Sequence, residues 1–339
     1  MELTERWERV RAVMDRIDFA RLWPGFAPCR FALYTDSECV LDGRRMDKPA
    51  EFCANTAMKY NGETIAMWNM MEEINDSVLA GKMAHEMFHA FQMDSGWDCF
   101  PNETEALLRY HADGADQEIR LRANRLLAEL AGRSDIDKLN EVLRLRKWRQ
   151  KEHPCEYGYE ALEEQLEGSA NYVEWKAREM IDPARAEKLR ERMKRTMTNT
   201  DELFPVRVAC YTSGALLIDA MARAGLDPFS APVPFARSLL PGDVPDIRPE
   251  RDDEAARALK AYDSETRRIV ESAVAKNDVA LTGSAEIKYF NIYDARHRDG
   301  YLTSTYFVMC IKDGQDVMLQ GDFVIETKDG ITADRILRA

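Results

Sequence analysis

The sequence lacks any apolar run of membrane-spanning length, and it lacks a leader-like segment. Charged residues interrupt every window of about 18 residues, and residues 1–26 carry charge every few positions without an apolar core. We therefore expect neither a transmembrane helix nor a signal peptide. The formal net charge of −13 argues against binding to nucleic acid or to anionic membranes, because both carry negative charge. These absences favour a cytoplasmic protein.

Paired cysteines are also absent. The seven cysteines are scattered and never form a Cys-x-x-Cys pair, so we expect reduced thiols and neither a disulfide framework nor a cysteine zinc site. No cysteine has a histidine partner in a recognisable motif, which argues against a cysteine protease. Histidine is scarce too, because the chain has only five, and two of them lie four residues apart.

Strand-like and helix-like patterns divide the chain into blocks. Short β-branched and aromatic runs fill residues 30–69, where Asn61-Gly62 is a strong hairpin signal, so we expect a small, mostly antiparallel sheet there. Apolar periodicity and capping residues predict helices over residues 2–20, 76–94, 102–131 with a break near Gly114, 134–151, 156–181, 183 onward, 211–225 and 250–276.

Strand patterns return in the last sixty residues. The prediction is therefore an α+β protein of two domains. The first, residues 1–278, is mostly helical and carries the small N-terminal antiparallel sheet. The second, residues 279–339, is a small β domain of unknown role.

The segment HEMFH, residues 85–89, carries the clearest chemical signal. Histidines four residues apart share one face of a helix, so His85 and His89 can hold one metal ion between them. Zinc favours imidazole ligands, and a catalytic zinc keeps one position open for water. Glu86 is rotated by about 100° from His85 and can act as general base toward zinc-bound water as the nucleophile. The alternative, two half-buried histidines on an amphipathic helix, is disfavoured by the scarcity of histidine.

The residues alone leave the third ligand open. A metzincin site would continue with Gly at position 92 and His at position 95, but the chain has Gln92 and Ser95, so that arrangement is excluded. The remaining candidates are two histidines and five acids, namely His111, His153, Glu103, Glu105, Glu163, Glu164 and Glu167.

Residues 166–174, LEGSANYVE, resemble the glutamate helix of the gluzincin metallopeptidases of the peptidase MA-like superfamily. In the aminopeptidase branch of that group the helix reads N-E-G-F-A-x-Y, and its glutamate binds zinc. The resemblance implies a zincin-like fold, Glu167 as third ligand of one Zn²⁺ per chain, and zinc-dependent hydrolysis of bonds in a peptide or protein substrate. Gly168 agrees with it, because glycine inside a helix costs about 1 kcal/mol relative to alanine and indicates close helix packing.

The chain departs from this family in two ways. Residues 90–166 separate the two motifs, a longer interval than is usual in the family, and an inserted helical hairpin over residues 102–151 would account for it. The G-x-M-E-N segment with which neutral aminopeptidases hold a free amino terminus is missing from residues 50–75. The resemblance therefore does not imply exopeptidase activity.

Two further features have both a functional and a structural interpretation. Tyr211 stands at the expected start of helix 211–225, and similar Tyr-x-x-Gly segments follow the glutamate helix in gluzincin-like families. Tyr211 can donate to the oxyanion of the reaction, or it can simply pack at a helix entry. Residues 63–69 can form an edge strand that pairs with an extended substrate, or an edge strand without a ligand.

Two other functions stay open at this point. One is a catalytically silent protein of zincin fold with a binding or regulatory role. The other is a zinc hydrolase that acts on a non-peptide amide. The retained Glu86 argues against the first, because a structural metal site has no use for a base.

Overall fold

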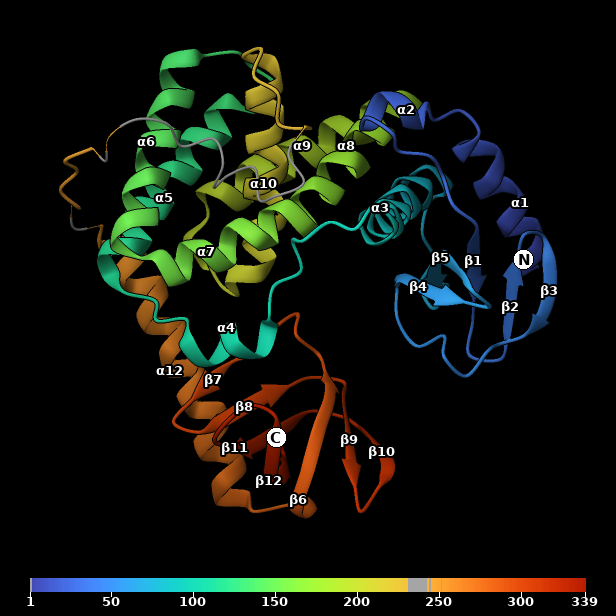
Figure 1. Cartoon of the computed structure of the whole chain (residues 1–339), viewed down its shortest axis with the longest axis vertical. Coiled ribbons are helices and arrows are strands. Elements are labelled where there is room, and N and C mark those ends of the chain that lie inside the picture. The colour runs from blue at the N-terminus through green and yellow to red at the C-terminus, as the bar shows by residue number, and fades with distance from the viewer. Residues whose placement is uncertain (1, 231–242, 244, 251) are drawn as a thin grey trace.

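The computed structural model describes residues 2–230, 243, 245–250 and 252–339. The protein is mixed α/β, with one sheet near each end of the chain and a group of helices between them (Figure 1). Figure 1 shows the N-terminal sheet beside the long helix α3 (Asp76–Asp94), while the C-terminal sheet lies below the helices. A search of the described residues found no helix that combines the length and the apolar character needed to cross a membrane.

The N-terminal sheet has the strand order β3-β2-β1-β5-β4 and one parallel pair, β1 with β5. Asn61 and Gly62 both have positive φ, 51° and 86°, as a tight Asn-Gly hairpin requires, so the predicted turn is confirmed. The strands are β1 (Phe31–Tyr34), β2 (Glu38–Leu41), β3 (Arg44–Asp47), β4 (Thr56–Tyr60) and β5 (Glu63–Asn69).

The prediction of an edge strand at residues 63–69 is wrong. β5 pairs with β4 over Glu63–Met67 and with β1 over Ala66–Asn69, so it lies inside the sheet. The parallel partner is distant in sequence, which is why strand patterning did not reveal it. The free edge on this side of the sheet belongs to β4.

The helices follow the predicted order, and the predicted break near Gly114 is confirmed at residues 110–113. Three segments differ from the prediction. Residues 2–20 form two helices, residues 156–181 contain a π-helical segment, and the helix expected to start at Tyr211 begins five residues earlier, directly after Pro205. The helices besides α3 are α1 (Leu3–Met14), α2 (Phe19–Leu22), α4 (Glu103–Arg109), α5 (Gly114–Leu130), α6 (Ile136–Glu152), α7 (Pro154–Glu163), the π-helical η1 (Glu164–Gly168), α8 (Ser169–Ile181), α9 (Pro183–Thr198), the short 3₁₀ η2 (Thr200–Glu202), α10 (Val206–Arg223) and α12 (Asp253–Lys276).

The C-terminal sheet is antiparallel throughout, with the order β10-β9-β6-β12-β11-β8-β7. Val270 and Ala273 of α12 pack on it against Val324 and Leu337, while Ala255 at the other end of α12 packs among the central helices. The division at residue 278 stays a prediction. The strands are β6 (Val279–Phe290), β7 (His297–Arg298), β8 (Tyr301–Ser304), β9 (Phe307–Lys312), β10 (Gln315–Gln320), β11 (Phe323–Thr327) and β12 (Thr332–Arg338).

Two glycines let η1 and α10 approach each other closely. A Cβ atom on Gly168 would lie 2.6 Å from the Cα atom of Gly214 and 3.1 Å from the carbonyl oxygen of Cys210. Packed protein interiors do not accommodate such contacts without movement of the backbone. Gly168 therefore sets the distance between the two segments, and Glu167 precedes it directly.

Replacement of Gly168 with alanine should destabilise the protein by about 1–3 kcal/mol, because the added methyl group meets backbone atoms that cannot rotate away. Chemical denaturation measures this change. Gly158→Ala is the matched control, since nothing lies within 4 Å of a Cβ atom there and helix propensity alone should stabilise that variant by up to about 1 kcal/mol. Equal stability of the two variants would contradict the close packing of η1 on α10.

Candidate metal centre

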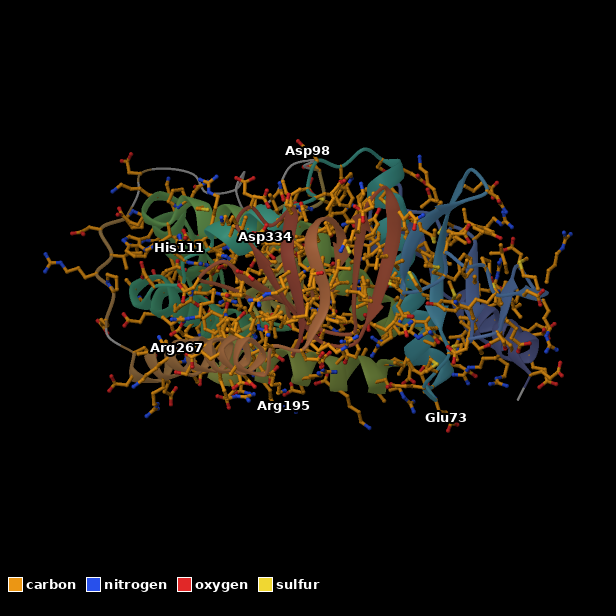
Figure 2. All side chains as sticks on the ribbon, turned by 90° about the horizontal axis from the view of Figure 1, so that it is seen from below. Glu73, Asp98, His111, Arg195, Arg267 and Asp334 are labelled. Carbon is orange, nitrogen blue, oxygen red and sulfur yellow. The ribbon has the colours of Figure 1, made fainter. Side chains whose placement is uncertain are left out.

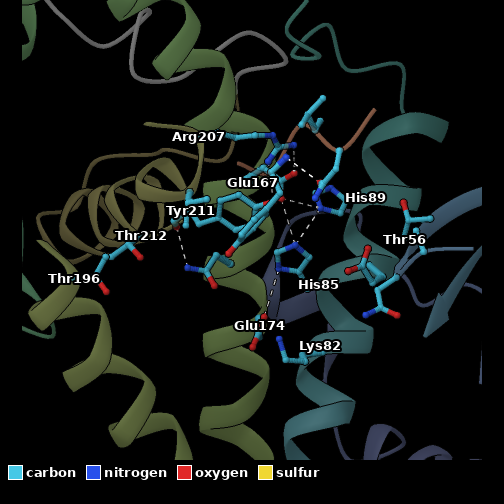
Figure 3. A pocket seen from close by; sticks show the side chains of 18 of the residues that line it. Thr56, Lys82, His85, His89, Glu167, Glu174, Thr196, Arg207, Tyr211 and Thr212 are labelled. Atoms are coloured by element: carbon cyan, nitrogen blue, oxygen red, sulfur yellow. Dashed lines mark hydrogen bonds and ion pairs between the residues drawn. The ribbon is translucent and has the colours of Figure 1, made fainter. Parts of the chain in front are cut away.

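Three helical segments bring the candidate residues to one place. α3 carries His85, Glu86 and His89, η1 carries Glu167, and α10 carries Tyr211. Figure 3 shows the labelled side chains of His85, His89, Glu167 and Tyr211 directed toward one another. α3 packs against α8, which continues directly from η1, so the two motif segments lie side by side despite their separation in sequence.

The spacing of three ligand atoms fits a metal ion. His85 Nε2 and His89 Nε2 lie 3.1 Å apart, and Glu167 Oε2 lies 3.5 Å from the first and 3.3 Å from the second. Bonds of about 2.1 Å in a tetrahedral zinc site place the ligand atoms about 3.4 Å from one another. Among the residues that the structure describes, this is the only group of its kind.

The charges around Glu167 also favour a cation. Burial opposes ionisation of this carboxyl, but His89, His85 and Arg207 hold its pKa well below the usual value. Arg207 Nη2 donates to Glu167 Oε1 at 2.8 Å, while Glu167 Oε2 is buried and accepts no hydrogen bond. A buried carboxylate oxygen without a donor is costly, and a metal ion held with the two histidines would satisfy it.

His85 responds to the same surroundings. Burial disfavours its charged form, yet contacts with Glu167 and Glu174 raise the pKa of His85 to about 10. In the absence of a metal the imidazole therefore carries a proton between two carboxylates. A divalent cation bound here would displace that proton, because histidine binds a metal ion in its neutral form.

Two residues that the sequence did not point to orient the imidazole rings. Glu174 Oε2 lies 3.5 Å from His85 Nδ1, and His89 Nδ1 donates to Gln92 Oε1 at 2.8 Å. Gln92 in turn donates to the carbonyl oxygen of Leu166 at 2.9 Å. Gln92 thus fixes Nε2 of His89 as the nitrogen that faces Glu167, while Glu174 lies on the Nδ1 side of His85 at ion-pair distance without a hydrogen bond to it. In the sequence Gln92 only excludes the metzincin pattern, and no motif marks Glu174 as a partner of a histidine.

Replacement of Glu174 with glutamine should weaken zinc binding by about 10–100-fold, as is typical for loss of a group that orients a histidine ligand. Competition with a chromophoric chelator measures the affinity. Glu179→Gln is the matched control, because Glu179 lies on the same helix but is exposed. An unchanged affinity in the Glu174 variant would show that its contact with His85 does not support the metal.

Tyr211 lies inside α10 and not at its start, so the predicted position at a helix entry is wrong. Its ring is nearly parallel to that of His85, with centroids 6.1 Å apart, and its hydroxyl accepts a hydrogen bond from Arg207 Nη1 at 2.8 Å. Burial and then the charge of Glu167 raise the pKa of Tyr211 well above its usual value. The phenol therefore stays protonated and remains able to donate.

The other candidates for the third ligand lie outside the histidine pair. Glu103 accepts from Arg207 Nε at 3.1 Å, and Glu163 lies 3.6 Å from Arg207 Nη1. Glu164 accepts from Ser213 Oγ and pairs with Arg146. The remaining three make other contacts: Glu105 with Arg109, His153 with Asp113, and the backbone N–H of His111 with Glu156.

The side chains of His85, His89 and Glu167 border a cavity of about 620 Å³. Its wall includes Glu86, whose pKa is raised chiefly by burial, and residues Ala54–Thr56 beside the free edge of β4. The same cavity is thus lined by a candidate base, Glu86, by a candidate oxyanion donor, Tyr211, and by the three candidate ligand residues. No protein-family model, curated protein or solved structure matches the chain.

Proposed function

We propose that the protein is a zincin-like zinc metallopeptidase of the gluzincin type, with His85, His89 and Glu167 holding one Zn²⁺ ion. The observation that carries this proposal is the spacing of three candidate ligand atoms, 3.1–3.5 Å apart, one of which is a buried carboxylate oxygen that accepts no hydrogen bond. The resemblance of residues 166–174 to the gluzincin glutamate helix supports the same assignment.

The chain's own groups divide the chemistry between them. A Zn²⁺ ion in this place would polarise the scissile carbonyl and lower the pKa of a water molecule. Glu86 accepts a proton from the attacking water and delivers it to the leaving amine. Tyr211 donates to the oxygen on which negative charge develops. Arg207 contacts Tyr211 and Glu167 at once, and thereby fixes both.

A peptide substrate suits the cavity better than a compact amide. β4 has one free edge, and residues 54–56 at its start line the cavity. An extended peptide can add to such an edge through backbone hydrogen bonds, whereas a small amide has no repeated backbone to pair there.

The proposed activity is tested with zinc-loaded protein and a mixture of unstructured peptides, with new termini identified by mass spectrometry. Cleavage should appear with zinc, disappear after treatment with a chelator and return when zinc is added back. Cleavage that survives complete removal of the metal would contradict the proposal, and so would the absence of any cleavage by fully loaded protein.

Tyr211→Phe should lower kcat by about 10²–10³-fold, the effect of one missing oxyanion donor. KM and zinc content should change little, because the contact forms only in the transition state. Steady-state kinetics on any cleaved peptide measures this. Tyr172→Phe is the control, because Tyr172 packs against Trp23 in the core and does not line the cavity. A Tyr211→Phe rate within about threefold of wild type would remove Tyr211 from the mechanism, since a tenfold change is 1.36 kcal/mol.

A further inference from the structure

The C-terminal sheet contributes to the cavity that His85, His89 and Glu167 border. In Figure 1 the loop after β6 rises from this sheet toward the helices, and Figure 2 shows the same sheet in front of them in the perpendicular view. An orange segment of this part of the chain borders the site in Figure 3. The cavity wall includes four large apolar side chains from it: Phe290, Ile292, Tyr293 and Phe307.

The C-terminal part of the wall lies apart in sequence from the ionisable groups of the site. His85, Glu86, Glu167 and Arg207 are ionisable and buried, whereas the C-terminal part contributes these four side chains together with Asn291. Other elements add further apolar residues to the cavity, among them Trp68, Leu189 and Met193. Ile292 also borders a smaller cavity of about 120 Å³ together with Arg207, so the apolar wall reaches the arginine that binds Glu167. Tyr293 is 53% exposed although it faces this cavity, which leaves its ring available to a ligand.

The loop that carries Ile292 and Tyr293 is held in place by side-chain hydrogen bonds. Asn291 Nδ2 donates to Thr305 Oγ1 at 2.8 Å, and Thr305 Oγ1 donates to Asp294 Oδ1 at 2.8 Å. The backbone N–H of Asn291 donates to Ser304 Oγ at 3.0 Å. A surface held in its binding conformation loses little conformational entropy when a ligand arrives.

We infer that Phe290, Ile292, Tyr293 and Phe307 form an apolar subsite that selects peptides with a large aromatic or aliphatic side chain near the scissile bond. The inference rests on the proposed peptidase function and names the substrate class of that same site. Apolar walls gain free energy when they bury apolar surface of a ligand, and the free edge of β4 offers backbone pairing to the same peptide. The C-terminal sheet would then determine specificity, while the helices carry the chemistry.

Two fluorescent peptides test this inference on the zinc-loaded full chain. Both consist of Ser, Gly and Ala, and one has a single central Phe where the other has Ala. Fluorescence anisotropy measures binding, and mass spectrometry measures cleavage. Wild type should prefer the Phe peptide by about tenfold or more, the scale of discrimination by an apolar pocket. Ile292→Ala combined with Tyr293→Ala should remove most of that preference, because the Phe peptide should lose more affinity than the Ala peptide.

Tyr289→Ala is the matched control, because Tyr289 is 64% exposed on β6 and does not line the cavity. A wild-type preference that survives in the double variant overturns the subsite while leaving the peptidase function intact. Preferential binding of the Phe peptide without any cleavage, lost in the double variant, supports the subsite but contradicts the peptidase function. Equal binding of both peptides by wild type overturns the subsite outright.

Discussion

Replacement of Glu86 with glutamine should lower kcat by about 10³-fold or more while the protein keeps its zinc. Glutamine has nearly the same shape, so the neighbouring histidines should stay in place, but an amide cannot accept the proton of the attacking water. General base catalysis contributes about 10²–10⁴-fold. The other glutamates that line the cavity have different contacts. Glu167 is fixed by Arg207 and faces the histidines, Glu174 contacts His85, and Glu202 accepts from Thr196 Oγ1 at 2.7 Å. Zinc analysis measures the metal content, and single-turnover kinetics measures the rate of hydrolysis.

Two outcomes would contradict the assigned role of Glu86. Loss of zinc from Glu86→Gln would make Glu86 a structural residue of the metal site and weaken the peptidase proposal. Retention of both zinc and hydrolysis would place the base elsewhere. Glu179→Gln again serves as the control for a neutralised glutamate, because it lies on the exposed face of α8.

Glu167→Ala should lower zinc affinity by more than about 100-fold, and hydrolysis should fall with the metal content. Loss of a group that only orients a ligand costs about 10–100-fold, so loss of a ligand atom itself should cost more. The truncation also leaves Arg207 without the carboxylate oxygen to which its Nη2 donates at 2.8 Å. Some loss of folding stability should therefore accompany the loss of zinc, because a buried donor of Arg207 loses its acceptor, although Arg207 keeps its ion pair with Glu103.

Glu163→Gln separates these two effects. Glu163 lies one helical turn before Glu167, is fully buried and contacts the same arginine, 3.6 Å from its Nη1 atom, but it does not approach the histidines. Its variant should keep stoichiometric zinc. If Glu163→Gln loses zinc and Glu167→Ala keeps it, the third ligand has been assigned to the wrong turn of the helix.

The proximity of His85 and His89 could be predicted because its signal is local. His85 and His89 lie one helical turn apart, so one helix brings them together whatever the rest of the fold does. Gly168 likewise predicted a close helix contact, which the structure places at Gly214. The choice of Glu167 among seven candidates came from the resemblance and not from spacing, and the structure places its Oε2 atom beside both histidines.

The residues that support the cluster could not be predicted, because they depend on contacts between distant segments. Arg207 reaches Glu167 from α10, and Gln92 reaches Leu166 across the α3 interface. No periodicity within one helix shows which partner another helix will offer. Gln92 is the exception, because it lies three residues after His89 on the same helix face, and that spacing could have predicted its contact with His89.

Two features of the backbone were beyond sequence patterns for a similar reason. The parallel pairing of β1 with β5 joins strands about thirty residues apart. Because of this pairing, the edge strand is β4 and not β5. The π-helical η1 contains Glu167, and such wide turns often occur at functional sites although no residue type marks them. Contacts across the fold decide both features, whereas strand and helix patterns describe only single segments.

The most direct test of the proposed metal site is anomalous diffraction at the zinc edge from crystals of the zinc-loaded protein. We expect one strong peak per chain, about 2.0–2.2 Å from His85 Nε2, His89 Nε2 and a carboxylate oxygen of Glu167. A peak bound by Glu103 or Glu163 in place of Glu167 would contradict the ligand assignment. The absence of any peak at the histidine pair in fully loaded protein would contradict the metal centre, and with it the proposed hydrolysis.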